Sequence, residues 1–300
     1  MRFRVTIVVI LLAITFSLVG VSVYNSNFKV EESNDEIEEV DYSFKVMSFN
    51  VRTISFDFNG NPNDSITLRA PLIISQINDE DPDIIGCQEW TFTHETKIAT
   101  LLSEKYGYYA ISRDGLPIGE MGAIFYKKSR FELIEVNTIW LSDTPDEISI
   151  GWDGGCHRIC TTARLKDLKS GEIIEFNNTH LDNKGNLARE NGTKMITDIV
   201  TKSDYPSLVL GDFNYNTFNY NYRYCTEYMD DARVLSEGAI TTATYNGWDT
   251  SALNVGGSPI DHIMLKKDTF NVSGYKVLNY LVDGLFASDH FAIVATLEIK

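Results

Sequence analysis

Short runs of β-branched and aromatic residues alternate with polar connections from Phe44 to the C-terminus, and this pattern predicts many strands. The runs are Phe44–Val51, Asp83–Cys87, Ala123–Tyr126, Phe131–Trp140, Arg158–Leu165, Ile173–His180, Ser207–Leu210, Ile260–Leu265, Tyr275–Tyr280 and Phe291–Ile299. Helical spacing of apolar residues marks residues 66–78, 93–104 and 186–201; in the last, Leu187, Met195, Ile196 and Ile199 would share one face. Ala123–Tyr126 and Phe131–Trp140 look like hairpin partners. We therefore expect a single α+β domain with packed sheets and outer helices.

The amino terminus has the pattern of an export segment. Arg2 and Arg4 precede the uncharged apolar run Val5–Val23, which predicts a signal peptide or membrane anchor over residues 1–24. The basic flank would stay in the cytoplasm, so the rest of the chain would be exported and either anchored through residues 5–23 or secreted. Residues 25–41 are strongly acidic and predict a solvated linker, which leaves residues 42–300 as the domain.

Net charge and cysteine content exclude several classes of protein. The formal charge of −16 would repel polyanions, which argues against a passive nucleic-acid-binding module. An enzyme that acts on phosphate esters remains compatible, because a bound cation reverses the local field. The 4 cysteines do not form a disulfide-rich scaffold. We expect them to be small buried residues, with a disulfide between Cys156 and Cys160 as the alternative in an exported protein.

Polar residues repeatedly follow the apolar runs where the predicted strands end. These tails are Ser48-Phe49-Asn50, Gln88-Glu89, Asn178-Thr179-His180, Gly211-Asp212-Phe213-Asn214, Asp261-His262 and Ser288-Asp289-His290. Strand ends meet at an edge of a sheet, so loops there can direct such side chains into one cleft. A cleft rich in carboxylates and poor in His suits Mg²⁺, Mn²⁺ or Ca²⁺ better than Zn²⁺.

Each motif alone also has a structural explanation. Asp212 and Asn214 could stabilise a turn, since Gly-Asp-x-Asn is good turn chemistry. Glu89 could be an exposed strand end, and a single His is usually a hydrogen-bonded structural residue. The number and the order of the motifs together favour one site.

That order resembles the endonuclease/exonuclease/phosphatase family, which includes DNase I-like nucleases, neutral sphingomyelinases, inositol polyphosphate phosphatases and deadenylases. The matching elements are Met47-Ser48-Phe49-Asn50, residues 83–89, residues 119–126, Asn178-Thr179-His180-Leu181-Asp182, Gly211-Asp212-Phe213-Asn214, Ile260-Asp261-His262-Ile263 and Ser288-Asp289-His290. The resemblance covers Phe44 to Lys300. It implies a four-layer α/β/β/α sandwich with two mainly antiparallel sheets. Residues 138–146, 151–153, 158–159 and 244–247 resemble a bacterial hydrolase branch of the family.

The resemblance also implies a role for each matching residue. Metal ligands would be Glu89, Asn50 and Asp289, and the cation would be Mg²⁺ or Mn²⁺, with Ca²⁺ as a further candidate. Substrate phosphate would be bound by Arg158, Asn50 and Asn178. The catalytic residues would be His180, Asp212, Asn214, Asp261, His290 and Glu120, with His290 paired to Asp261 and His180 paired to Glu120. The reaction would be in-line attack of water on a phosphodiester or phosphomonoester.

Alternative functions remain open at this point. The substrate could be a small phosphorylated compound, a lipid headgroup or nucleic acid, so a nuclease that acts on extracellular DNA or RNA is the alternative within the family. An inactive ligand-binding module on the same fold is the alternative from another class. Its expected signature is loss of Glu89, Asp212 or His290, and all three are present. We expect a monomer, which contacts the membrane only if the N-terminal segment is uncleaved.

Overall fold

The structure is a computed structural model that describes residues 41–54, 64–115, 119–254 and 256–300. The chain divides into two compact units, Met1–Val40 and Asp41–Lys300, and the second is described below. The predicted signal or anchor and nearly all of the predicted linker lie outside the described residues. Within the described residues, no helix is long and apolar enough to span a membrane.

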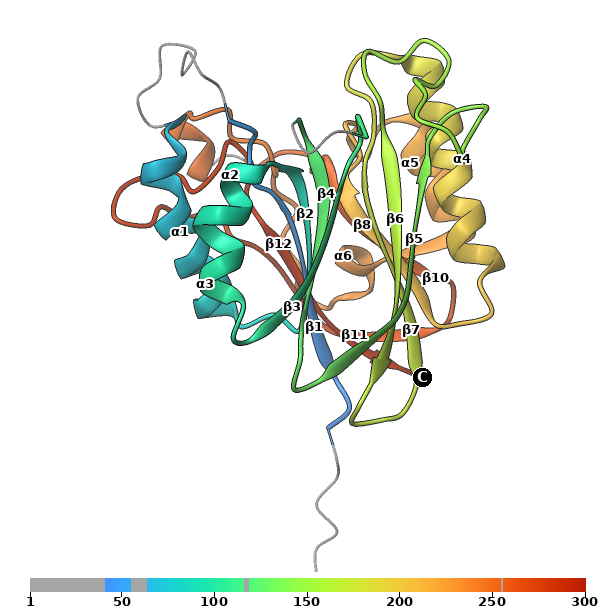
Figure 1. Ribbon diagram of the computed structural model, residues 1–300, viewed down its shortest axis with the longest axis horizontal. Coiled ribbons are helices and arrows are strands. Elements are labelled where there is room, and N and C mark those ends of the chain that lie inside the picture. The colour runs from blue at the N-terminus through green and yellow to red at the C-terminus, as the bar shows by residue number, and fades with distance from the viewer. Residues whose placement is uncertain (1–40, 55–63, 116–118, 255) are drawn as a thin grey trace, which may run out of the picture. The chain divides into compact units, whose positions relative to one another are not determined.

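Two six-stranded sheets form the centre of the unit Asp41–Lys300 (Figure 1). The first sheet has the order β11-β12-β1-β2-β4-β3 and comprises β11 (Phe270–Val277), β12 (Ile293–Ile299), β1 (Phe44–Asn50), β2 (Ile84–Trp90), β4 (Met121–Lys127) and β3 (Tyr106–Ser112). The second has the order β5-β6-β7-β8-β10-β9 and comprises β5 (Phe131–Trp140), β6 (Ile159–Asp167), β7 (Ile173–His180), β8 (Ser207–Asp212), β10 (Asp261–Lys266) and β9 (Met229–Asp231). All neighbours are antiparallel except β1 with β2 and β7 with β8.

Helices cover the outer face of each sheet, which makes the four-layer α/β/β/α sandwich expected from the sequence (Figure 1). The first sheet is covered by α1 (Ile66–Glu80) and by the short pieces α2 (Phe92–His94), η3 (Glu95–Ala99) and α3 (Thr100–Leu102). The second sheet is covered by α4 (Asn186–Lys202) and α5 (Tyr220–Tyr228). The remaining short helices are α6 (Ala232–Leu235) and η4 (Thr250–Asn254).

Alternation along the strands distributes apolar side chains between three layers of core. In β1, Phe44 and Val46 join the core between the sheets, whereas Met47 and Phe49 pack beneath the helices of the first sheet. This division follows from the two-residue period of a strand, which sends successive side chains to opposite faces. A buried strand of this kind therefore reads as nearly continuous apolar sequence rather than as simple alternation.

Several local expectations differ from the structure. The segments 121–127 and 131–140 do not form a hairpin: β4 and β5 belong to different sheets, so residues 128–130 cross the sandwich. Strand β11 begins at Phe270 and ends at Val277, earlier than the expected 275–280, and β3, β9, α5 and α6 were not anticipated. The buried stripe of α4 runs through Ala188, Ile196 and Val200, and Leu187 is exposed. Cys156 and Cys160 are free thiols, so the alternative disulfide is absent.

Candidate active site

The side chains that lie between the two sheets are apolar along most of the sandwich and polar at one end. In β8, Leu208 and Leu210 lie in the core between the sheets, and the next residue of the same parity is Asp212. In β7, Ile174 and Phe176 are followed at the same parity by Asn178 and then His180. The polar side chains placed on this inner face by the two-residue period are Asn50, Gln88, Asn178, His180, Asp212 and Asp261.

A backbone irregularity brings Glu89 to the same end. The pairing of β2 with β4 shifts register between Cys87 and Trp90, and Glu89 has φ 57°, in the left-handed region. A non-glycine residue with positive φ is uncommon and often lies at a functional site. This bulge directs Glu89 into the cleft even though its neighbour Gln88 occupies the inner face.

Asn50 connects the two sheets at the site. Its Nδ2 donates to Glu89 Oε1 and to Asp212 Oδ2, both at 3.1 Å, and its Oδ1 accepts from the backbone N–H of Arg52 at 3.0 Å. The other Glu89 oxygen accepts from the backbone N–H of Thr53 at 2.7 Å. The amide of Asn50 therefore orients two carboxylates, and its role as a direct metal or phosphate ligand stays a prediction.

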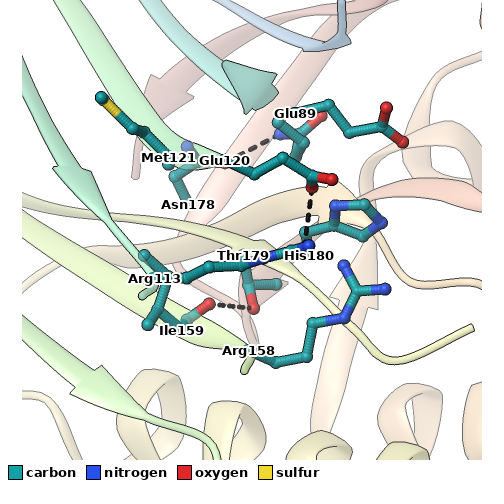
Figure 2. Close-up of a pocket in the computed structure, with 11 residues that line it drawn as sticks. Glu89, Arg113, Glu120, Met121, Arg158, Ile159, Asn178, Thr179 and His180 are labelled. Carbon is teal, nitrogen blue, oxygen red and sulfur yellow. Dashed lines mark hydrogen bonds and ion pairs between the residues drawn. The ribbon is translucent and has the colours of Figure 1, made fainter. Parts of the chain in front are cut away.

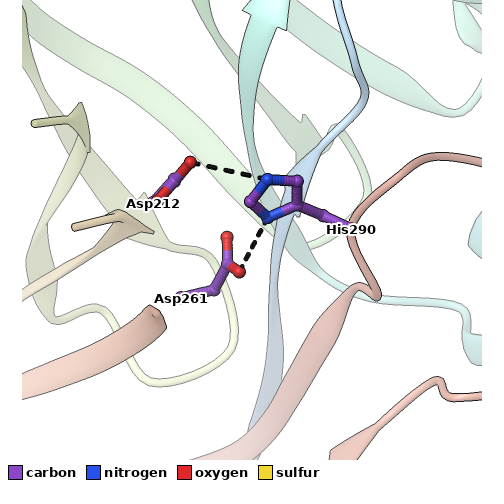
Figure 3. A group of neighbouring side chains, drawn as sticks. All are labelled: Asp212, Asp261 and His290. Carbon is purple, nitrogen blue, oxygen red and sulfur yellow. Dashed lines mark hydrogen bonds and ion pairs between the residues drawn. The ribbon is translucent and has the colours of Figure 1, made fainter. Parts of the chain in front are cut away.

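His290 is held between two buried aspartates (Figure 3). Its Nδ1 lies 2.9 Å from Asp261 Oδ2, the pairing expected from the sequence, and its Nε2 lies 3.7 Å from Asp212 Oδ2. Burial acts to lower the pKa of His290, but the carboxylates of Asp261 and Asp212 outweigh it and raise the pKa to about 10. Burial likewise raises the pKa of Asp212 to about 7, against the opposing effect of His290.

His180 is paired with Asp212 rather than with Glu120. Its Nε2 lies 3.3 Å from Asp212 Oδ2, whereas Glu120 Oε2 lies 2.7 Å from Arg113 Nη1 (Figure 2). The expected His180–Glu120 pair is thus replaced by two other pairs. Burial, followed by the positive charges of Arg158 and Arg113, lowers the pKa of His180 well below its usual range. Burial therefore favours the neutral form of His180, and Asp212 lies between two imidazoles.

Asn178 is buried beneath the cleft, and its amide is used within the protein. Its Nδ2 donates to the backbone oxygens of Cys87 and Ala123, both at 2.9 Å, and its Oδ1 accepts from Gln88 Nε2 at 2.8 Å. These bonds join β7 to β2 and β4 across the sandwich. This geometry fits a residue that fixes the spacing of the two sheets, and it leaves no amide hydrogen for the phosphate contact expected from the sequence.

Arg158 is directed toward the imidazole of His180, with Arg113 and Glu120 on the same side of the cleft (Figure 2). Its Nη2 donates a long hydrogen bond of 3.4 Å to Asn183 Oδ1, and its Nε lies 3.6 Å from Asp182 Oδ2. The structure provides no hydrogen-bond acceptor for Nε or Nη1 of this buried side chain among the described residues. A buried guanidinium with unused donors is suited to an anionic ligand.

Asn214 follows Asp212 in the left-handed conformation, with φ 53°. Its backbone N–H donates to Asp212 Oδ1 at 2.9 Å, which is the turn chemistry anticipated for Gly-Asp-x-Asn. Its Nδ2 donates to the backbone oxygen of Leu181 at 2.9 Å, while the residue lines the cleft. Turn formation and a place in the site therefore coincide in the same two residues.

A hard cation fits the carboxylates at the other side of the cleft. Burial raises the pKa of Asp289, and the charge of Glu89 raises it further, while His290 and Arg52 act in the opposite direction. A buried carboxylate whose charge is destabilised in this way is stabilised when a divalent cation binds to it, so the carboxylate donors of this part of the cleft fit a hard cation. Asp212, Asp261 and His290 also lie within 4.8 Å of one another by their ligand atoms. Because both nitrogens of His290 face aspartates, we interpret that group as a chain of proton-transfer residues.

The cleft has a volume of about 500 Å³ and is lined mainly by charged and polar residues. Sequence reasoning missed several of its residues: Arg52, Thr53, Arg113, Lys184 and Tyr245. Arg113 follows β3, which was itself not predicted, so no strand end marked this position. Tyr245 packs edge-on against His290, with a centroid distance of 5.1 Å, and remains half exposed at the mouth of the cleft.

Comparisons with known proteins show which family the chain is similar to. The profile described as the endonuclease/exonuclease/phosphatase family matches residues 47–290. A crystal structure of a protein of that family from Bacteroides thetaiotaomicron is 29% identical, with a TM-score of 0.77, and the match covers 85% of this chain and 97% of that one. The mannosyl-6-phosphatase of the same organism is 27% identical, with a TM-score of 0.75 and coverage of 85% and 99%. An uncharacterised protein of Acanthamoeba polyphaga mimivirus is 26% identical over 77% of this chain and 91% of its own length.

Proposed function

The chain belongs to the endonuclease/exonuclease/phosphatase family, and we propose that it is a divalent-metal-dependent phosphoesterase. Members of this family are hydrolases that act on phosphoesters. The observation that carries the proposal is the meeting, at one end of the sandwich, of Glu89 and Asp289 with the His290–Asp261 pair and with Asp212. This combination supplies cation ligands and proton-transfer groups within a single cleft.

The reaction is in-line attack of water on phosphorus without a covalent enzyme intermediate. The water oxygen forms a bond to phosphorus while the bond to the ester oxygen breaks and the alcohol or phenol departs. The Asp212–His290 pair takes up the proton of the attacking water and passes it to the departing oxygen or to solvent. Asp261 holds Nδ1 of His290 and so fixes the orientation of the ring. Arg158 binds a phosphoryl oxygen through the donors that lack a protein acceptor. Because water is the nucleophile, no side chain of the cleft forms a bond to phosphorus in this reaction.

Glu89 and Asp289 would hold the cation, and Asn50 would keep Glu89 in position. When bound, Mg²⁺ or Mn²⁺ polarises a phosphoryl oxygen and offsets the charge that develops in the transition state. The ligand set consists of carboxylate oxygens, and this chemistry favours these hard cations over zinc.

A substrate panel with the full chain and Mg²⁺ tests the proposal. The panel contains mannose 6-phosphate, because a 27%-identical neighbour is a mannosyl-6-phosphatase, together with a phosphocholine lipid and single- and double-stranded oligonucleotides. We expect hydrolysis of at least one phosphoester, loss of activity with EDTA and recovery with Mg²⁺ or Mn²⁺. Activity that is insensitive to chelation would show that the metal assignment is wrong. Cleavage of oligonucleotides alone would identify the nuclease alternative.

Two variants separate an active enzyme from a binding module. Glu89→Ala and His290→Ala should each abolish hydrolysis while the circular dichroism spectrum and melting temperature stay close to those of the wild type. Lys202→Ala is a matched control, because Lys202 is an exposed residue of α4 that pairs with Asp198 on the same helix. Undiminished turnover in both cleft variants would refute the assignment of the site.

We also propose that the domain acts outside the cytoplasm. The support is the basic flank and the apolar run Val5–Val23, followed by acidic residues. N-terminal sequencing of the protein recovered from cell fractions would distinguish cleavage from anchoring. Recovery of the full-length chain from the cytosol would contradict export.

A further inference from the structure

One wall of the cleft carries three cationic side chains with unused hydrogen-bond donors, and they come from three separate segments. Arg113 lies at the end of β3, Arg158 lies just before β6, and Lys184 lies in the loop after β7. Their convergence is a product of tertiary structure, since the segments belong to both sheets. In a chain with a formal charge of −16, such a group is unusual and points to an anionic ligand.

The acidic partners of these cations leave donors unused. Arg113 binds Glu120 through Nη1, but its Nε is buried and has no acceptor among the described residues. Arg158 is more than nine-tenths buried, and both Nε and Nη1 lack an acceptor. Its neighbour Asp182 already accepts from the backbone N–H groups of Gly155, Lys184 and Gly185, so this carboxylate mainly organises the loop.

Lys184 adds a charge without an acidic partner. No ion pair of its ammonium group is present within the part of the chain that the structure describes, and the residue is exposed at the cleft. Its aliphatic stem packs beside Gly155, where a Cβ would approach Lys184 Cδ to 2.8 Å. Glycine at position 155 therefore makes room for the lysine stem along this wall.

The number of free donors bears on the kind of phosphate ester that the cleft accepts. A phosphodiester has two non-bridging oxygens and one negative charge, and a bound cation would engage one of those oxygens. A phosphomonoester has three non-bridging oxygens and carries close to two negative charges at neutral pH. Arg113, Arg158 and Lys184 provide more unused donors than the single remaining oxygen of a diester can accept from.

We propose that the wall formed by Arg113, Arg158 and Lys184 binds the terminal dianionic phosphate of a phosphomonoester, so that the protein is a phosphatase rather than a phosphodiesterase. This inference rests on the proposed function and specifies its substrate class. Arg158 binds the phosphoryl group in either type of ester, whereas Arg113 and Lys184 engage the third non-bridging oxygen. A diester places an alkyl or aryl substituent on that oxygen and loses those contacts.

Two substrates with the same leaving group test the inference: p-nitrophenyl phosphate and methyl p-nitrophenyl phosphate, each with Mg²⁺. We expect kcat/KM of the wild type to favour the monoester by at least about 100-fold after correction for the uncatalysed rates. Arg113→Met and Lys184→Met should each lower kcat/KM for the monoester by roughly 10- to 100-fold and change that for the diester less than about 3-fold. Lys202→Met, which removes an exposed lysine of α4, is the matched control and should change neither value.

Binding of unreactive probes provides a second readout. Inorganic phosphate should bind the wild type more tightly than dimethyl phosphate in calorimetry, and Lys184→Met should weaken phosphate binding by about 10-fold while leaving dimethyl phosphate unaffected. The inference would be overturned if the wild type hydrolysed the diester as well as or better than the monoester, or if the variants lowered kcat/KM equally for both esters. Either result would leave the phosphoesterase assignment intact. No hydrolysis of either ester with Mg²⁺ or Mn²⁺, nor of any substrate in the earlier panel, would overturn both.

Discussion

Arg69 provides the sharpest test of how the fold holds the cleft in place. This residue of α1 is fully buried, and its guanidinium donates to backbone oxygens on three segments: Val51, Arg52 and Thr53 after β1, Asp64 before α1, and Ala287 before β12. The distances range from 2.6 Å to Val51 to 3.5 Å to Thr53. Arg69 thus connects the loop that positions Asn50 and Glu89 to the segment that carries Asp289.

Arg69→Met keeps most of the volume and removes the charge and all of these bonds. Burial lowers the pKa of Arg69 to about 10, so the side chain remains protonated at neutral pH, and its removal relieves that cost of desolvation. The variant nevertheless leaves several backbone oxygens unpaired and removes one of the two cations beside the buried Asp64, which keeps Arg52 Nε at 3.4 Å but loses Arg69 Nε at 3.5 Å. Because the variant weakens a buried ion pair and also removes the donors of several buried backbone oxygens, we expect the free energy of unfolding to fall by about 3–5 kcal/mol.

Urea unfolding monitored by circular dichroism measures this quantity, and the double variant Arg69→Met/Asp64→Leu tests the cause. If the weakened pairing of the Asp64 carboxylate is a main part of the effect, the double variant should recover about 1–2 kcal/mol relative to the single one. We further expect kcat of Arg69→Met to fall by more than about 10-fold under conditions where the variant is folded, because the loop 51–53 would no longer be fixed. A stability loss below about 1 kcal/mol, or full kcat in the folded variant, would refute this reasoning.

Three further predictions concern single positions. Asp261→Asn should lower kcat by roughly 10²- to 10⁴-fold with little change in melting temperature, since it disturbs the orientation of His290; a kcat within 3-fold of the wild type would contradict that role. Gly211→Ala should destabilise the fold by at least about 3 kcal/mol in urea unfolding, because a Cβ there would lie 1.8 Å from Thr179 O; a variant of wild-type stability would contradict this. Burial, with Arg69 nearby, lowers the pKa of His94 to about 3, so between pH 6.5 and 3 the unfolded chain binds a proton that the folded protein does not, and stability falls as the pH falls. The loss at pH 5 relative to neutral pH should be about 2 kcal/mol larger in the wild type than in His94→Gln, and equal losses would contradict the assignment.

Much of the site could be predicted from local sequence, because successive side chains of a strand point to opposite faces of its sheet. Once Leu208 and Leu210 are assigned to a buried face, the two-residue period places Asp212 on that same face, and the same reasoning places Asn178 and His180. The order of the polar motifs then identified the family, which the match over residues 47–290 confirmed. The resemblance to the family also implied that His290 pairs with Asp261, and the structure shows this pair. The metal, the roles of the individual residues and the export of the domain stay predictions.

Other features depended on contacts between segments that are distant in sequence. The sequence did not indicate that β4 and β5 lie in different sheets, because apolar runs joined by a short connection fit a hairpin equally well. The left-handed conformation of Glu89 depends on a register shift against β4, and Arg113 rather than His180 became the partner of Glu120 because β3 ends beside it. Local pattern therefore determined which side chains face the space between the sheets. Only the packing of one sheet on the other decided which of them meet, because pairing distances depend on register and loop paths that no short stretch of sequence contains.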